Sequence, residues 1–161
     1  MDSPLRRPEE ILAYRSLREI LGANPRSLWS VAPTDSALSA LQIMAEKNIG
    51  FLVVLDRDAI VGVLSERDLA RRLVLEKKTP ETTPVSDLMV RDVVTVDPTH
   101  TFGDCLRLMH QHGIRHLPVV DRGKPIAVVS IRDLLGEAVA HHAKIIAELE
   151  RERLESFIST A

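Results

Sequence analysis

Two short segments of this 161-residue chain combine residue types that can bind a phosphorylated sugar. They are Ser65–Asp68 (Ser-Glu-Arg-Asp) and Ser130–Asp133 (Ser-Ile-Arg-Asp), and each follows an aliphatic run typical of a strand. If a helix begins at each serine, its unpaired backbone N–H groups favour an anion there. The serine hydroxyl can add a donor, the arginine can form a bidentate contact with phosphate, and the aspartate can accept from two ribose hydroxyls.

The same segments also have a purely structural explanation. A serine followed three residues later by an acidic residue is typical of a capping box, in which the serine oxygen accepts from a backbone N–H and the acid bonds back to the first residue. The two explanations do not exclude each other, because both place the serine at the start of a helix. The residue types alone leave them open.

Other residues able to do chemistry are sparse. His110 and His112 lie two apart and would diverge on a helix, so they do not form a metal site with His116. Cys105 is the single cysteine, which excludes an intrachain disulfide and is most simply a small buried residue. The chain contains neither a Gly-x-Ser-x-Gly motif nor a Walker loop. We therefore expect no enzyme active site and no metal.

The two segments belong to two copies of a longer unit. Shifted by 65 residues without a gap, residues 30–70 match residues 95–135 at 15 of 41 positions. Upstream, Ile20-Leu21 resembles Leu88-Met89 at a shift of 68, so the first copy has three extra residues before its opening strand. We infer a tandem duplication whose copies share a core and are related by an approximate two-fold axis.

Each copy is predicted to fold as strand, helix, strand, strand, helix. The first helix should end at Asn48 in one copy and at Gly113 in the other, because both residue types favour the left-handed conformation. The last helix should open at Ser65 or Ser130. The strands are expected at Leu28–Val31, 51–55 and 60–64, and at Val93–Val96, 116–120 and 126–129. The middle and third strands are continuous aliphatic runs, which predict burial on both faces.

Composition limits the remaining possibilities. The chain is 45% hydrophobic but only 3% aromatic, so its core must be aliphatic. Its 21 Lys and Arg residues against 23 Asp and Glu residues give a formal charge of −2, which argues against a bulk nucleic-acid binder. There is no secretory signal, and no apolar run approaches the roughly 18 residues of a membrane span. We expect a cytoplasmic location.

The duplicated unit resembles the cystathionine β-synthase (CBS) domain pair. The residues that carry the resemblance are Gly62–Leu69 and Ala127–Leu134, supported by Asp87–Pro98 and Gly113–Asp121. The resemblance covers about Leu17 to Val139. The chain is similar in particular to small bacterial proteins made of one CBS pair and little else. It implies an α/β (α+β) fold with a tandem pair of βαββα repeats and flanking helices. The expected boundaries are an N-terminal helical segment 1–22, repeat one 23–75, a linker 76–84, repeat two 85–139 and a C-terminal helix 140–161.

The resemblance also implies a non-catalytic regulatory function. Such pairs bind adenosine-containing ligands, among them AMP, ADP, ATP, S-adenosylmethionine and sometimes NAD(H), in clefts between the two repeats. They form homodimers in which two pairs make a flat disc. Binding would change the relative angle of the repeats and so report energy or redox state to an unknown downstream protein.

The family's binding residues carry over by position. Phosphate and ribose would contact Ser65, Arg67, Asp68, Ser130, Arg132 and Asp133. The base would lie against the opening and middle strands, at Ser30, Val31, Ile49, Gly50, Phe51 and Leu52 in copy one and at Thr95, Val96, Ile114, Arg115, His116, Leu117 and Pro118 in copy two. Backbone groups can bind the edges of adenine, so little side-chain identity is required.

The copies differ at these positions, so we expect two inequivalent sites. Gly50 leaves room in its cleft, whereas Arg115 offers charge to a phosphate. Ala127 replaces Gly62 and should narrow the approach of the backbone to a ligand. One site could take AMP and the other a larger dinucleotide, or one could be empty.

The two ends of the chain carry apolar helical stripes, Ile11, Tyr14, Leu17 and Ile20-Leu21 at one end and 138–149 at the other. They either pack on the chain's own core or contribute to a homodimer. Three other functions stay open: a dimeric scaffold with vestigial clefts, a weak nucleic-acid binder using Arg71-Arg72 and Lys77-Lys78, and a low catalytic activity on nucleotides.

Overall fold

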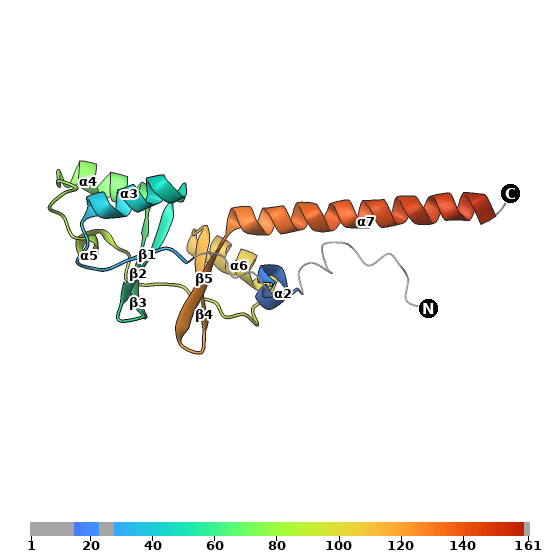
Figure 1. Ribbon diagram of the computed structural model, residues 1–161, viewed down its shortest axis with the longest axis horizontal. Coiled ribbons are helices and arrows are strands. Elements are labelled where there is room, and N and C mark those ends of the chain that lie inside the picture. The colour runs from blue at the N-terminus through green and yellow to red at the C-terminus, as the bar shows by residue number, and fades with distance from the viewer. Residues whose placement is uncertain (1–14, 23–27, 160–161) are drawn as a thin grey trace. The chain divides into compact units, whose positions relative to one another are not determined.

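The predicted duplication is visible in the boundaries of the secondary structure. The computed structural model describes residues 15–22 and 28–159, and the side chains of that range up to residue 155 (Figure 1). Its elements are α2 (Leu17–Leu21), β1 (Ser30–Val31), α3 (Ala37–Lys47), β2 (Phe51–Asp56), β3 (Ala59–Ser65), α4 (Glu66–Leu75), α5 (Val85–Leu88), α6 (Phe102–His112), β4 (His116–Asp121), β5 (Lys124–Ser130) and α7 (Ile131–Ser159). The bounds of α3, β2 and β3 recur 65 residues later in α6, β4 and β5. The mixed fold built from two repeats is confirmed.

Helix ends and hairpin turns follow from local residue types. Helix α3 ends at Asn48, with φ 52° and ψ 49°, and α6 ends at Gly113, with φ 62° and ψ 29°, both left-handed as predicted. The turn between β2 and β3 has positive φ at Arg57 and Asp58, as a two-residue type I′ hairpin requires.

The opening strand differs between the repeats. In the first repeat β1 pairs in parallel with β2, and β2 pairs antiparallel with β3. In the second repeat the strand expected at Val93–Val96 is reduced to a single bridge, between Val96 and Val119. The physical reason is Pro118: its counterpart Val53 donates its N–H to the carbonyl of Trp29 at 3.3 Å, and proline has no N–H to donate.

Burial of the strands corrects part of the sequence prediction. The middle strands are continuously buried, over residues 52–54 in β2 and 117–119 in β4. The third strands alternate instead: in β3, Gly62 and Leu64 are buried whereas Val61 and Val63 are half-buried. One face of β3 and β5 therefore remains partly accessible despite its aliphatic sequence.

The segments that precede the repeats are exchanged between them. The chain divides into two compact units, one with α2, α6 and α7 and the other with β1, α3, β2, β3, α4, α5 and residues 118–128, which make up most of β4 and β5. In the first unit Leu17 N–H donates to the carbonyl of His100, and in the second Val85 N–H donates to the carbonyl of Asp35, both at 2.8 Å. A second matched pair runs in the opposite direction, from Phe102 N–H to the carbonyl of Arg15 and from Ala37 N–H to that of Thr83, also at 2.8 Å. We call α2 and α5 the leading segments, because each precedes one repeat. Helix α2, which precedes repeat one, packs in the unit of α6, and α5, which precedes repeat two, packs in the unit of α3.

The apolar face predicted for the N-terminal helix is described only in part. Leu17 is fully buried and Ile20 nearly so, as a core-facing stripe requires. Ile11 and Tyr14 lie outside the described residues. Ser16 caps α2 with a capping box to Glu19, which fixes where the helix begins.

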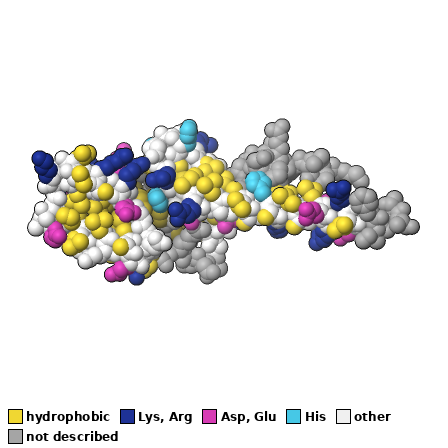
Figure 2. Space-filling view, turned by 90° about the horizontal axis from the view of Figure 1, so that it is seen from above, with side chains coloured by type: hydrophobic (Ala, Val, Ile, Leu, Met, Phe, Trp, Pro, Cys, Tyr) yellow, Lys and Arg dark blue, Asp and Glu magenta, His cyan; other side chains and the backbone are white. Residues whose placement is uncertain are grey.

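The last helix of repeat two and the expected C-terminal helix are one element. Helix α7 runs without a break from Ile131 to Ser159, whereas its counterpart α4 stops at Leu75 (Figure 1). Hydrophobic side chains gather along α7 in Figure 2. The exposed ones are Leu135, Val139, Ile146, Leu149 and Leu154. Among the described residues, no helix is both long enough and apolar enough to cross a membrane.

Candidate functional site

Both serines cap the helices that they were predicted to open. Ser65 Oγ accepts from the N–H of Asp68 at 3.1 Å and donates to its Oδ2 at 2.6 Å. Ser130 Oγ accepts from the N–H of Asp133 at 3.2 Å and donates to its Oδ2 at 2.7 Å. The capping interpretation is therefore correct. Each serine hydroxyl donates its hydrogen bond to the aspartate carboxylate. A phosphate could accept a hydrogen bond from the same hydroxyl only after the hydroxyl had rotated away from the aspartate.

Each cap sits against the start of the middle strand. In repeat one Glu66 N–H donates to the carbonyl of Gly50 at 3.0 Å, and Phe51 pairs with Ser65 in the antiparallel ladder. In repeat two Ile131 N–H donates to the carbonyl of Arg115 at 2.9 Å. The structure thus brings the Ser-x-Arg-Asp segment and the residues predicted around positions 50 and 115 together, in the same way in both repeats. We call the two groupings half-site one (Gly50, Phe51 and Ser65–Asp68) and half-site two (Arg115, His116 and Ser130–Asp133).

Half-site one carries more negative charge than its sequence motif alone indicates. A Cβ added to Gly50 would lie 3.5 Å from Oε2 of Glu66, so this carboxylate occupies part of the room that glycine leaves. The Arg67 side chain is 55% exposed, and its Nε lies 3.9 Å from Oδ1 of Asp68. The arginine is accessible to a ligand but is flanked by two acids.

Half-site two surrounds a half-buried histidine with charge. Burial lowers the pKa of His116, and the positive charges of Arg115 and Arg132 lower that pKa further, while Asp133 opposes them. Arg115 and Arg132 are both exposed. His116 is therefore held towards its neutral form beside two exposed guanidinium groups.

Several residues predicted to contact the base are core residues. Leu52 and Leu117 are 0% exposed, and Val31, Val96 and Pro118 are also buried, so a ligand could reach them only through their backbone. Ser30, Ile49, Phe51 and Ile114 are half-buried and Thr95 is exposed. In repeat two the backbone of Val96 is already occupied, since its N–H donates to the carbonyl of Pro118 at 3.0 Å and its carbonyl accepts from Val120 at 2.8 Å.

The role expected for Gly62 is wrong. The difference between Gly62 and Ala127 predicted that the missing side chain of Gly62 lets a ligand approach the backbone closely. The structure instead places Met89 there: a Cβ on Gly62 would lie 2.6 Å from Met89 Sδ and 3.1 Å from the carbonyl oxygen of Val90. Val63 and Val90 exchange backbone hydrogen bonds of 2.9 and 2.8 Å beside it. Glycine is needed at this position because the chain itself passes close by.

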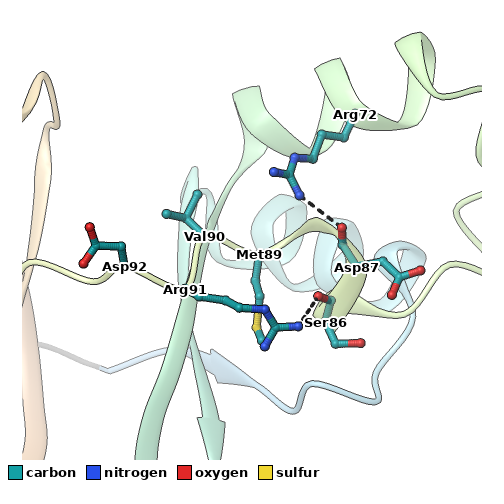
Figure 3. A pocket seen from close by; sticks show the side chains of 7 residues that line it. All are labelled: Arg72, Ser86, Asp87, Met89, Val90, Arg91 and Asp92. Atoms are coloured by element: carbon teal, nitrogen blue, oxygen red, sulfur yellow. Dashed lines mark hydrogen bonds between the residues drawn. The ribbon is translucent and has the colours of Figure 1, made fainter.

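An open pocket of about 540 Å³ lies beside α4 and the segment that follows α5 (Figure 3). Its lining residues are Arg72, Ser86, Asp87, Met89, Val90, Arg91 and Asp92. Arg72 Nη1 donates to the carbonyl of Asp87 at 3.0 Å, and Arg91 Nη2 donates to that of Ser86 at 2.9 Å. Sequence reasoning missed Arg91, which has no recognisable motif around it. These contacts hold α5 in place, and no residue of either half-site lines the pocket.

Cys105 behaves as the small core residue that was predicted. Its side chain is 0% exposed, and burial raises the pKa of its thiol to about 11, with a smaller contribution from Asp104. In the described part of the chain, no group of three His, Cys, Asp or Glu side chains is arranged to hold a metal ion.

Comparison with known proteins accounts for these paired half-sites. The family model described as CBS domain matches residues 18–75 and 85–140. The protein MK0525 of Methanopyrus kandleri is 34% identical over 112 residues, which are 68% of this chain and 57% of that protein. A CBS-domain protein from Burkholderia ambifaria has a solved structure with a TM-score of 0.74 and 39% identity, over 78% of this chain and 94% of that one.

A further solved structure, of CBSX2 in complex with AMP, has a TM-score of 0.66 and 28% identity, over 78% of this chain and 97% of that one. The two matched ranges contain the two Ser-x-Arg-Asp segments and the strands that support them. On this evidence the chain belongs to the CBS domain family and carries two copies of that domain.

Proposed function

We propose that this protein is a non-catalytic regulatory module of the cytoplasm that binds adenosine-containing nucleotides at its two half-sites. The observation that carries the proposal is the repeated geometry, in which a capped Ser-x-Arg-Asp helix start is bonded to the first residues of the middle strand. The AMP complex of the related CBSX2 supports the ligand class. That the clefts lie between the repeats stays a prediction.

The aspartates are the residues best suited to bind ribose. Each uses Oδ2 to hold its serine, and an ionised carboxylate has further lone pairs with which to accept from a sugar hydroxyl. The cap fixes the side-chain rotamer before a ligand arrives, so little conformational entropy is lost on binding. Ligand binding would shift the population of two arrangements of the protein, and a partner would recognise one of them.

The proposal is tested by a thermal-shift panel on protein freed of bound ligand by unfolding and refolding. The panel contains AMP, ADP, ATP, NAD⁺, NADH, S-adenosylmethionine and GMP. A ligand present at about 100 times its Kd stabilises by about 2.7 kcal/mol, which raises the Tm of a chain of this size by about 5–10 °C. A rise with adenine ligands and not with GMP is expected.

The matched control comes from a capping box outside both half-sites. Asp104 caps α6 through Thr101 in the same way but belongs to neither half-site. The double variant Asp68→Asn, Asp133→Asn should lose the ligand-dependent rise, whereas Asp104→Asn should keep it. A rise that survives in the double variant contradicts the site, and a flat panel on folded wild-type protein contradicts the function and favours a scaffold.

We also propose that the protein is a homodimer in which α7 pairs with α7 of a second copy. The exposed residues Leu135, Val139, Ile146 and Leu149, together with half-buried His142, alternate by four and three positions. This is the heptad spacing of a coiled coil. One core position carries the β-branched residues Val139 and Ile146, and the other carries leucine except at His142, a pattern close to the one that two-stranded coils favour.

The double variant Val139→Lys, Ile146→Lys should convert the dimer to a monomer in light scattering coupled to size exclusion. Leu154 is similarly exposed, at 64%, but does not fall on the heptad positions that would form the core of the coiled coil. The variant Leu154→Lys is therefore the matched control and should stay dimeric. A monomeric wild-type protein, or a dimer unaffected by the double variant, contradicts the pairing.

The nucleic-acid alternative loses support from the contacts of its basic residues. Arg72 is bonded to the carbonyl of Asp87, and Lys78 Nζ lies 2.8 Å from Glu76 and 3.9 Å from Asp87. Two of the four cations in the proposed patch are thus already engaged.

A further inference from the structure

The two half-sites have the same backbone but opposite charge at one point. Position 66 in repeat one corresponds to 131 in repeat two, and position 50 corresponds to 115. The same hydrogen bond joins each pair, from Glu66 N–H to the carbonyl of Gly50 and from Ile131 N–H to that of Arg115. Because this hydrogen bond is the same in both repeats, the two half-sites differ at this junction in their side chains and not in the bond that joins the two segments.

The difference amounts to a reversal of net charge. In half-site one the junction carries the Glu66 carboxylate, placed over Gly50, with Arg67 and Asp68 beside it. The three ionised side chains give a net charge of −1. In half-site two the carboxylate is replaced by apolar Ile131 and the glycine by exposed Arg115.

With Arg132 and Asp133, the three charged side chains of half-site two give a net charge of +1. At the next position Phe51 is replaced by His116, which is held towards its neutral form and so adds no charge to this count. The hydrogen bond from Ile131 N–H to the carbonyl of Arg115, at 2.9 Å, and the cap that joins Ser130 to Asp133 gather these charged residues around one helix start.

Resting on the proposed function, we propose that the half-sites take different classes of adenosine ligand. Half-site two takes adenosine that carries a 5′-phosphate, which Arg115 and Arg132 can hold by charge-assisted hydrogen bonds. Half-site one takes adenosine without a negative charge at the 5′ position, because a phosphate there would meet the carboxylates of Glu66 and Asp68. Both half-sites keep an aspartate for ribose, so the nucleoside part is common to them.

The inference is tested by titration calorimetry of the full-length protein with AMP and with adenosine. Wild-type protein should bind one AMP per chain tightly, and Asp133→Asn should abolish that binding while Asp68→Asn leaves it intact. Adenosine should bind in the presence of saturating AMP, and this binding should be lost in Asp68→Asn. Raising the salt concentration should weaken AMP binding and leave adenosine binding unchanged.

Exchange of the junction residues makes the test specific. Arg115→Gly, which installs the residue of repeat one, should weaken AMP binding at least about tenfold with little effect on adenosine. Glu66→Ile, which installs the residue of repeat two, should create a second AMP site per chain. If Arg115→Gly fails to fold, Ile131→Glu adds the opposing charge at a helix start where glutamate is well tolerated, and the same loss of AMP affinity is expected.

Two failures are distinguishable. If AMP binds both half-sites of the wild-type protein with equal affinity, or if the exchanged variants bind AMP as the wild-type protein does, the charge inference is wrong and the nucleotide function stands. If neither AMP nor adenosine binds folded protein, the proposed function is wrong and the inference fails with it.

Discussion

Gly62 faces Met89 so closely that any side chain on Gly62 would collide with it, since a Cβ there would lie 2.6 Å from Sδ and 2.9 Å from Cγ. The backbone carbonyl of Val90, at 3.1 Å, limits how far the strand can yield. We predict that Gly62→Ala lowers the free energy of unfolding by about 1–3 kcal/mol, the usual cost of overpacking. Urea denaturation measures it.

The control is a double-mutant cycle. If Met89 causes the cost, Gly62→Ala should be less destabilising in a Met89→Ala background than in the wild-type background. Ala127→Gly in repeat two, where alanine is already accommodated, should cost no more than about 1 kcal/mol. Equal costs of Gly62→Ala in both backgrounds would show that the contact is not responsible.

Leu17 should stabilise α6, which is far from it in sequence. It is fully buried in the unit that contains α6 and α7, and its N–H is bonded to His100. Leu17→Ala should cost about 2–5 kcal/mol. Hydrogen exchange should then accelerate in α6 more than in α3. The matched variant Leu88→Ala should show the opposite order, because α5 packs with α3. Acceleration in α3 by Leu17→Ala would contradict the exchange of segments.

His116 should make the protein less stable as the pH falls below about 6.5. Its folded-state pKa is lowered from 6.5 by burial and by the arginines, so the unfolded chain binds the proton more readily. The stability is complete above pH 6.5 and is lost as the pH falls towards the lowered pKa. His116→Phe, which installs the residue of Phe51, should flatten this part of the stability curve. Identical curves for both proteins between pH 5 and 7.5 would contradict the prediction.

Cys105 should be unreactive in the folded protein. With a thiol pKa of about 11 and no exposed surface, almost no thiolate is present or reachable at pH 8. Ellman's reagent should label it only in denaturant. Rapid stoichiometric labelling under native conditions would contradict the burial and reopen a redox role.

Local signals in the sequence predicted the repeat architecture well. Asn48, Gly113, Ser65 and Ser130 each fix an element boundary through their own backbone or hydroxyl group, and the structure confirms all four. Such signals work because a cap or a left-handed residue acts within one helical turn.

The errors arose where a distant segment decides the local environment. The absence of a full opening strand in repeat two depends on Pro118, a residue of the partner strand. The true neighbour of Gly62 is Met89, which precedes the other repeat. The carboxylate over Gly50 comes from a helix that begins after two strands have passed. A single sequence gives each residue type but not which segment is placed against it.

The exchange of α2 and α5 between the repeats also sets the order in which the two cores can form while the chain is being synthesised. The core that contains α3 receives its last helix, α5, soon after its strands have emerged from the ribosome. Helix α2 is made first, but its hydrogen-bond acceptors at Pro98 and His100 are made much later. Leu17 and Ile20 can therefore be buried in this core only after residue 100 has been made, and until then they are apolar side chains without the core that covers them in the folded protein.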